Sequence, residues 1–106
     1  MKTEMKVLLY IKRSGQDKDG FSPLMGRISV KGRGNSIAQF ACKFKIKVQL
    51  WNATAQRCMG KSKVATMANR EIERVLLLLQ KRFNELADIR DVVTAEEVRN
   101  VFPRSG

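Results

Sequence analysis

The sequence contains no histidine among its 106 residues, and it has only one tyrosine and one tryptophan. Without histidine, the chain cannot hold a Ser-His or Cys-His nucleophile, a histidine metal site or a histidine acid or base. Most familiar enzyme classes are therefore excluded. We expect no catalytic residue, no metal site and no cofactor in this chain.

Cysteines and long apolar runs are also scarce. Cys42 and Cys58 lack the spacing of a CxxC motif, which favours reduced structural thiols in a cytoplasmic protein. The apolar run at residues 7–11 is too short for a signal peptide, and no stretch approaches the roughly 20 apolar residues of a membrane span. We expect a cytoplasmic protein without a membrane partner.

Acidic residues are rare in the first half of the chain. Residues 1–63 hold 14 lysines and arginines against three acids, whereas residues 64–106 hold seven basic and seven acidic residues. The whole net charge of +11 therefore belongs to the first half. This asymmetry favours a polyanionic partner, nucleic acid before an anionic membrane, over a basic surface that only confers solubility.

The first half shows the two-residue alternation of half-buried strands. Apolar residues occupy alternate positions in residues 5–12, in residues 24–31 and again through residues 40–46. The glycine-rich segment 31–35, between the second and third of these runs, predicts a hairpin turn. We expect a sheet over residues 5–47.

The second half shows helical spacing instead. Ser62 is a candidate N-cap, and the apolar residues that follow it predict a long helix over about residues 63–88. Thr94 and Glu97 have the spacing of a capping box, with valines placed as a hydrophobic staple. They predict a short second helix that ends at Phe102, before a proline.

The resulting order, β-β-β-α-α, predicts an α+β fold. One face of a three-stranded antiparallel β-sheet packs against the long C-terminal helix, and a short terminal helix follows. The opposite face of the sheet then stays in water. This is the face on which we expect function.

This open face carries basic and hydrogen-bonding side chains, as a sheet that binds in the major groove of DNA requires. Arg27 can form a bidentate pair with guanine and Gln39 with adenine, whereas lysines contact phosphates. The residues predicted on this face are Lys6, Tyr10, Lys12, Arg27, Ser29, Lys31, Gln39, Lys43 and Lys45.

Several short segments carry a resemblance to a known family. They are residues 6–13, 23–30, 38–43 and 50–52, and a helix start at 60–62 that leads to 68–70. In their order and spacing they resemble the N-terminal arm-type DNA-binding domain of tyrosine recombinases (the phage-integrase family), particularly integrases of conjugative transposons and related mobile elements. One departure is Val48, since such domains often place a proline shortly before the Leu-Trp pair.

The resemblance implies that the sheet lies in the major groove of arm-type sites, away from the core sites where strands are cut. Carried over by position, it assigns base reading to Tyr10, Lys12, Arg27, Ser29, Gln39 and Lys43, and places the hairpin around Arg33 beside the DNA backbone. With the neighbouring cations, the candidate DNA-binding residues are Tyr10, Lys12, Arg13, Arg27, Ser29, Lys31, Arg33, Gln39, Lys43 and Lys45.

The resemblance also implies that the chemistry lies in another domain, which holds the family's arginines, histidine and tyrosine nucleophile. Residues 1–92 are then the arm-type domain, and residues 93–106 are a short helix and linker towards a core-binding and catalytic region absent from this chain. Double-stranded DNA is the expected partner, together with other recombinase protomers in a synaptic complex.

Two further functions are compatible with the sequence. Basic α+β domains also bind double-stranded RNA, although the predicted sheet face lacks the paired aromatic residues that bind single-stranded RNA. Alternatively, the apolar run at residues 75–79 could make the long helix a protein-interaction surface. Competition between duplex DNA and duplex RNA, and sedimentation at high salt, would separate these functions.

Overall fold

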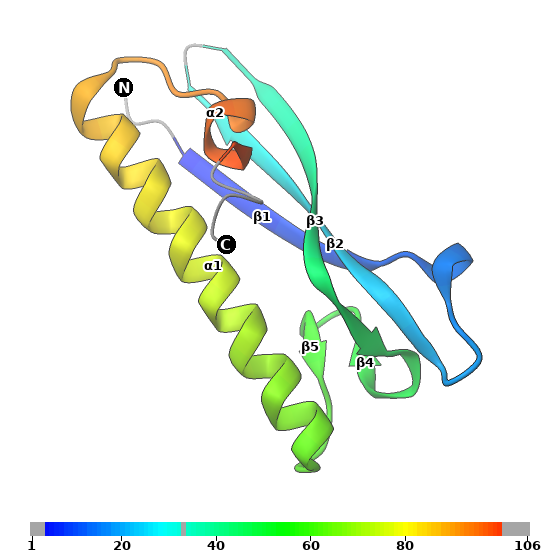
Figure 1. The fold of residues 1–106 in the computed structure, drawn as a ribbon. Helices are drawn as coiled ribbons and strands as arrows, with labels where there is room; N and C mark the ends of the chain where they lie inside the picture. The colour runs from blue at the N-terminus through cyan, green and yellow to red at the C-terminus, as the bar shows by residue number, and fades with distance from the viewer. Residues whose placement is uncertain (1–3, 33, 101–106) are drawn as a thin grey trace.

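The computed structural model describes residues 4–32 and 34–100. Its three long strands precede two helices, which confirms the predicted α+β order (Figure 1). The sequence did not predict the short hairpin, whose two strands have two residues each, or the two short 3-10 turns. The elements are β1 (Glu4–Ile11), η1 (Arg13–Gly15), β2 (Phe21–Lys31), β3 (Ser36–Lys47), η2 (Val48–Leu50), β4 (Trp51–Asn52), β5 (Arg57–Cys58), α1 (Lys63–Ile89) and α2 (Ala95–Arg99).

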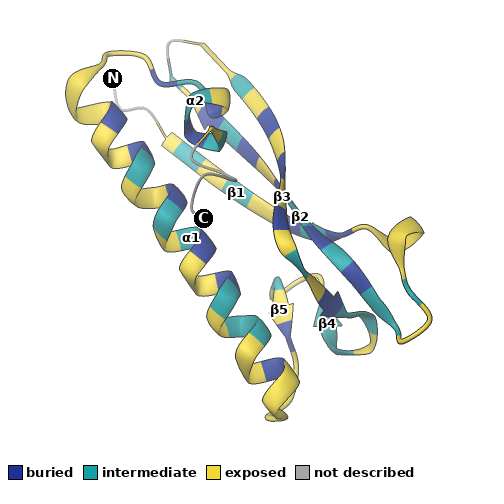
Figure 2. Cartoon of the chain, viewed as in Figure 1, coloured by how far each residue is buried: buried dark blue, intermediate teal, exposed yellow. Residues whose placement is uncertain are grey.

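The three long strands form one antiparallel sheet in the order β1-β2-β3. Their alternation separates two faces, because successive side chains of a strand point to opposite sides. Leu9, Ile28 and Phe40 lie on the buried face, and Figure 2 shows buried and exposed residues alternating along the strands. A Cβ at Gly26 would lie 2.3 Å from the ring of Phe40, so only glycine fits where this ring covers β2.

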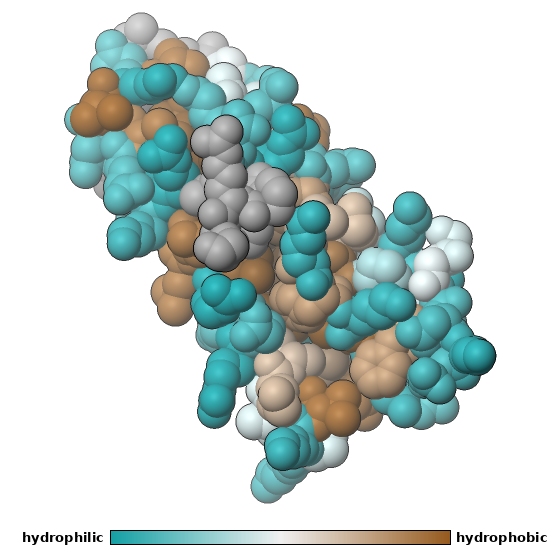
Figure 3. Space-filling model, viewed as in Figure 1, coloured by the Kyte–Doolittle hydropathy of each residue, from teal (hydrophilic) through white to brown (hydrophobic). Residues whose placement is uncertain are grey.

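Both helices cover the buried face. In Figure 1, α1 runs along the length of the sheet, and α2 packs against β2 and β3 near one end. Ile72 and Leu79 of α1 and Val98 of α2 are 1% exposed or less. In the space-filling view from the same side, hydrophobic surface follows the seam between α1 and the strands, between hydrophilic side chains (Figure 3).

Local capping signals fix the helix starts as predicted. The Ser62 hydroxyl accepts a hydrogen bond from the Ala65 N–H, and α1 ends one residue beyond the predicted end. Thr94 and Glu97 form the complete capping box at the start of α2. However, α2 ends at Arg99, and the predicted end at Phe102 lies outside the described residues.

The boundary between domain and linker at residue 92 stays a prediction. Val93, Ala95 and Val98 are buried in the same core cluster as the sheet and α1. The Ala95 N–H also donates to the Ser36 hydroxyl at 2.8 Å, which ties the start of α2 to the start of β3. Neither helix in the described part of the chain has the length and hydrophobicity needed to cross a membrane.

The middle strand differs from the prediction at its start. It begins at Phe21, three residues earlier than expected, so Pro23 lies inside the central strand. The pairing with β3 is interrupted at the next residue, Leu24. Ala41 pairs with Met25 and Lys45 with Pro23, which leaves residues 42–44 opposite a single residue of β2.

Candidate nucleic-acid interface

The face of the sheet opposite the helices consists of cross-strand rows, which the pairing of the strands defines. We call this surface the open face. Each of its three central rows takes one residue from each strand. The rows are Lys6, Ser29 and Ile37; Leu8, Arg27 and Gln39; and Tyr10, Met25 and Ala41.

Arg27 and Gln39 are cross-strand partners at the centre of the open face. Both side chains are exposed, and no ion pair in the described part of the chain involves Arg27. Directly opposite residues of an antiparallel pair have Cβ atoms about 5 Å apart, so the two side chains start from adjacent positions. The guanidinium can donate two hydrogen bonds to a base edge, and the amide can donate one and accept one.

The other predicted residues of the open face have mixed exposure. Tyr10 and Ser29 are half-buried, one in each of the rows that flank Arg27. Lys31, at the end of β2, is exposed and lies opposite Glu4 in the register with β1. The structure therefore brings Tyr10, Arg27, Ser29, Lys31 and Gln39 together on one surface, as the sequence predicts.

Two further cations extend this surface beyond the end of β1. Lys12 and Arg13 are exposed where the chain leaves β1 and enters η1. The Lys12 N–H donates to the Pro23 carbonyl at 3.0 Å, which holds this turn against β2. Arg33, assigned to the hairpin between β2 and β3, lies outside the described residues.

Lys43 and Lys45 differ from the other predicted cations. Lys43 lies in the interruption of the β2–β3 pairing, where it has no strand partner on β2. Its backbone is in the left-handed region, with a φ of 70°. Lys45 lies opposite Pro23, and its Nζ is 3.2 Å from Oδ2 of Asp17. Lys45 is therefore already paired with an acid, which the sequence did not indicate.

Asp17 organises the loop between β1 and β2. Its Oδ1 accepts hydrogen bonds from the N–H groups of Asp19 and Phe21, each at 3.0 Å. The Phe21 N–H, with Lys45 and the Asp19 N–H, lowers the pKa of Asp17 below the usual value for an aspartate. A lowered folded-state pKa stabilises the fold above the unfolded value, and this stabilisation is lost as the pH falls through the folded value. At neutral pH the loop therefore keeps its ionised anchor.

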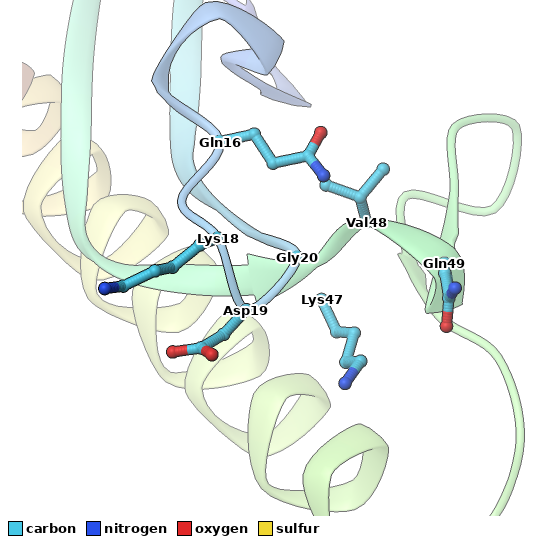
Figure 4. Close-up of a pocket in the computed structure, with 7 residues that line it drawn as sticks. All are labelled: Gln16, Lys18, Asp19, Gly20, Lys47, Val48 and Gln49. Atoms are coloured by element: carbon cyan, nitrogen blue, oxygen red, sulfur yellow. The ribbon is translucent and has the colours of Figure 1, made fainter.

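A hollow of about 300 Å³ lies where the same loop meets the end of β3 (Figure 4). Gly20, with φ of 85°, makes the turn into β2, and the Val48 N–H donates to its carbonyl. Lys18 and Lys47 extend from the hollow in different directions, so they do not converge on one point. The Nζ of Lys47 lies 5.3 Å from the centre of the Phe21 ring. The lining residues are Gln16, Lys18, Asp19, Gly20, Lys47, Val48 and Gln49.

Comparison with known families identifies the kind of domain that this chain forms. The model of a family described as Arm DNA-binding domain matches residues 9–99, most of the chain. The chain belongs to this family. The match confirms the resemblance to the arm-type domain of tyrosine recombinases, and it extends through α2 to Arg99. No curated protein and no solved structure matches the chain significantly.

Membership of this family assigns DNA binding to the chain. An arm DNA-binding domain is non-catalytic. Among the described residues, no group of three acids, cysteines or histidines comes together as a metal site. Both cysteines are free and buried, and burial raises the pKa of Cys42 to about 12 and also raises that of Cys58. At neutral pH both thiols stay protonated and unreactive.

Two amide side chains of this arm DNA-binding domain hold the β4–β5 hairpin against α1 and β1, and the sequence indicated a role for neither. Asn69 of α1 accepts from the Cys58 N–H at 2.7 Å and donates to the Cys58 carbonyl at 2.9 Å. Gln56, in the turn of the β4–β5 hairpin, accepts from the Leu9 N–H at 2.9 Å. The only sequence signal for either residue is that Asn69 lies within one of the segments that resemble the family.

Proposed function

We propose that this domain binds double-stranded DNA with sequence preference by laying the open face in the major groove of arm-type sites. One observation carries the proposal: Arg27 and Gln39 are paired and exposed at the centre of the sheet face that the helices leave uncovered. These two residue types form the bidentate pairs that distinguish guanine and adenine in the major groove.

The dimensions of the sheet support this mode of binding. Neighbouring strands lie about 4.8 Å apart, so the backbones across the Leu8–Arg27–Gln39 row span about 10 Å. The major groove of B-DNA is about 12 Å wide. The central side chains of the sheet therefore face base edges, and the outer ones face the phosphates on either side.

The residues divide into two roles on this basis. Arg27 and Gln39 read bases, and Tyr10 and Ser29 add hydrogen bonds beside them. The cations at the margins contact phosphates and set the register without reading sequence. Those proposed for this role are Lys6, Lys12, Arg13 and Lys31, with Lys43 at the interruption of β3, whereas Lys45 is already paired with Asp17.

We further propose that the domain is one module of a tyrosine recombinase that integrates and excises a mobile element. The family match supports this context. Catalysis would belong to another domain of the parent protein, and other recombinase protomers would be partners in the synaptic complex. We also propose a cytoplasmic location, which the two free, buried cysteines support.

The structure gives less support to a protein-interaction helix. Within residues 75–79, Val75 and Leu79 are buried in the core, and only Leu77 is largely exposed, at 68%. The apolar run is thus mainly the buried centre of α1. A single exposed leucine makes a small apolar contact compared with a stable protein interface.

A salt titration tests the proposal. We would select duplexes from a random DNA library, then measure binding of the best one by fluorescence anisotropy between 50 and 200 mM salt. If about 6–10 phosphates are neutralised, the affinity should fall roughly 10³–10⁵-fold over this range. Binding that does not depend on salt, or no binding at low salt, would overturn the proposal.

A competition experiment separates DNA from RNA. Unlabelled duplex DNA of the selected sequence should displace the labelled duplex much more effectively than duplex RNA of the same sequence. A-form RNA has a deep and narrow major groove that side chains cannot read, so the open face should not fit it. Equal competition by the two duplexes would favour the RNA-binding alternative.

A further inference from the structure

The interruption between β2 and β3 leaves a second hollow, of about 210 Å³, which we call the bulge pocket. Its lining is apolar except for two lysines. The pocket forms where residues 42–44 leave the ladder opposite Leu24 and open a space beside it. Its lining residues are Pro23, Leu24, Ala41, Lys43, Phe44 and Lys45.

The bulge pocket continues the open face. Ala41 belongs to the Tyr10–Met25–Ala41 row, and Pro23 and Lys45 form the next cross-strand pair beyond it. Ala41 also lies two residues along β3 from Gln39, about 7 Å at the rise of a strand. That distance corresponds to about two base-pair steps of roughly 3.4 Å. A base read by Gln39 and a group entering the bulge pocket therefore fit within the same site.

We propose that the bulge pocket receives the 5-methyl group of a thymine, so that the domain distinguishes thymine at one position of its DNA site. This inference rests on the proposed function, because it requires the open face to lie in the major groove. The thymine methyl is the one apolar group that base edges present there. An apolar pocket among hydrogen-bonding residues matches it.

The charges around the pocket favour a base edge over a phosphate. Pro23 supplies no N–H donor to its wall, and the ammonium of Lys45 is bound to Asp17. An anion entering the pocket would therefore meet apolar walls and the single unpaired charge of Lys43. Lys43 is exposed beside the pocket, where it can contact the phosphate of the nucleotide whose base enters.

A scan with deoxyuridine tests the proposal on the wild-type protein. Each thymine of the selected duplex is replaced in turn by deoxyuridine, which removes only the 5-methyl group. We expect the affinity to fall about three- to tenfold at one position, the effect of removing one buried methyl group. The remaining positions should change less than twofold.

A filled pocket provides the matched test. In Ala41→Leu, the larger side chain occupies the bulge pocket, and Ala41 is exposed, so the fold should tolerate it. The ratio of thymine to deoxyuridine affinities at the sensitive position should fall to about one. The control is Ile37→Ala, which changes an exposed apolar residue in a different row of the open face and should preserve the ratio.

The outcomes are distinguishable. Insensitivity to deoxyuridine at every position, or a selected site without thymine, overturns this proposal and leaves DNA binding by the open face intact. A sensitive position that persists in Ala41→Leu also overturns it, because the methyl is then read elsewhere on the sheet. If no sequence is selected and no duplex binds, the proposed function itself fails.

Discussion

The two faces of the sheet are built from the same three strands but meet different surroundings. Arg27 and Ile28 are neighbours in β2, and Arg27 is exposed whereas Ile28 is 0% exposed. One face holds the domain together by packing, and the other remains free for binding. Because the alternation has a period of two, a shift of one residue would exchange the faces.

The interruption in β3 preserves this separation. Residues 42–44 oppose one residue of β2, so β3 contains two residues more than its partner over this stretch. Because two is an even number, the alternation of buried and exposed side chains along β3 continues unchanged beyond the interruption. Ala41 and Lys45 therefore lie on the open face at both sides of the interruption, while Ile46 returns to the core.

Ile28→Ala should have the largest effect on stability, because Ile28 lies on the face of the sheet that packs against the helices. Ile28 is fully buried, and truncating a buried isoleucine removes packing and leaves a cavity. We expect the free energy of unfolding to fall by about 2–5 kcal/mol. Urea denaturation followed by circular dichroism measures this loss.

The matched control is Arg27→Ala, one residue away on the open face. Its free energy of unfolding should stay within about 0.5 kcal/mol of the wild type, as for other exposed substitutions. If Arg27→Ala destabilised the domain as strongly as Ile28→Ala, the open face would be needed for folding and not only for binding.

Arg27→Ala should instead reduce DNA binding. Loss of a bidentate pair with guanine costs about 1–3 kcal/mol, which is about 5- to 150-fold in affinity, and it should flatten the preference at one base pair. Anisotropy titrations with the selected duplex and with single-base variants measure both effects.

Lys31→Ala is the control for this prediction. Lys31 is exposed and assigned to phosphate, so its loss should weaken all duplexes alike. Lys45 is a poorer choice, because Asp17 already neutralises it. If Arg27→Ala and Lys31→Ala lowered affinity equally on every sequence, the assignment of base reading to Arg27 would be wrong.

The separation of the faces could be predicted from the sequence because it depends on local patterns. Alternation in each strand assigns its residues to a face, and Ser62 and the Thr94–Glu97 box define helix starts through contacts three residues apart. Such signals lie within a few residues of the structure that they produce. The pairing of Arg27 with Gln39 then follows from a hairpin between adjacent strands.

The interactions that refine the interface are distant in sequence. Lys45 and Asp17 are 28 residues apart, Leu9 and Gln56 are 47 apart, and Ala95 pairs with Ser36 across 59 residues. None of these pairs has a local pattern, because each depends on where the fold brings its two ends. The start of β2 was missed for a related reason, since a proline usually marks a strand end.

Two serines on the side of the sheet that the helices cover differ in their hydrogen bonding. The Ser36 hydroxyl accepts from the Ala95 N–H, whereas no group in the described chain bonds the fully buried Ser22 hydroxyl. Ser36→Ala leaves the buried Ala95 N–H without a partner and should cost about 1–2 kcal/mol of unfolding free energy. Denaturation of this variant tests whether α2 is tied to the sheet through this bond.

Ser22→Ala is the matched control for Ser36→Ala. It removes a buried hydroxyl that lacks a partner, so stability should be unchanged or should rise. A loss in Ser22→Ala equal to that in Ser36→Ala would show that the Ser22 hydroxyl has a bonding partner in solution.

Asp17→Asn should have the smallest effect, at the margin of the open face. Asparagine keeps an Oδ1 acceptor for the Phe21 and Asp19 N–H groups but removes the charge that pairs with Lys45. The released ammonium can then bind a phosphate, which should steepen the dependence of log K on log salt by up to about 0.9.

Affinity at 50 mM salt should rise a few-fold in Asp17→Asn. The control is Asp19→Asn, whose carboxylate makes no ion pair in the described chain and which should therefore change the slope less. An unchanged slope in Asp17→Asn would mean that Lys45 lies away from the DNA, and would confine the interface to the rows centred on Arg27.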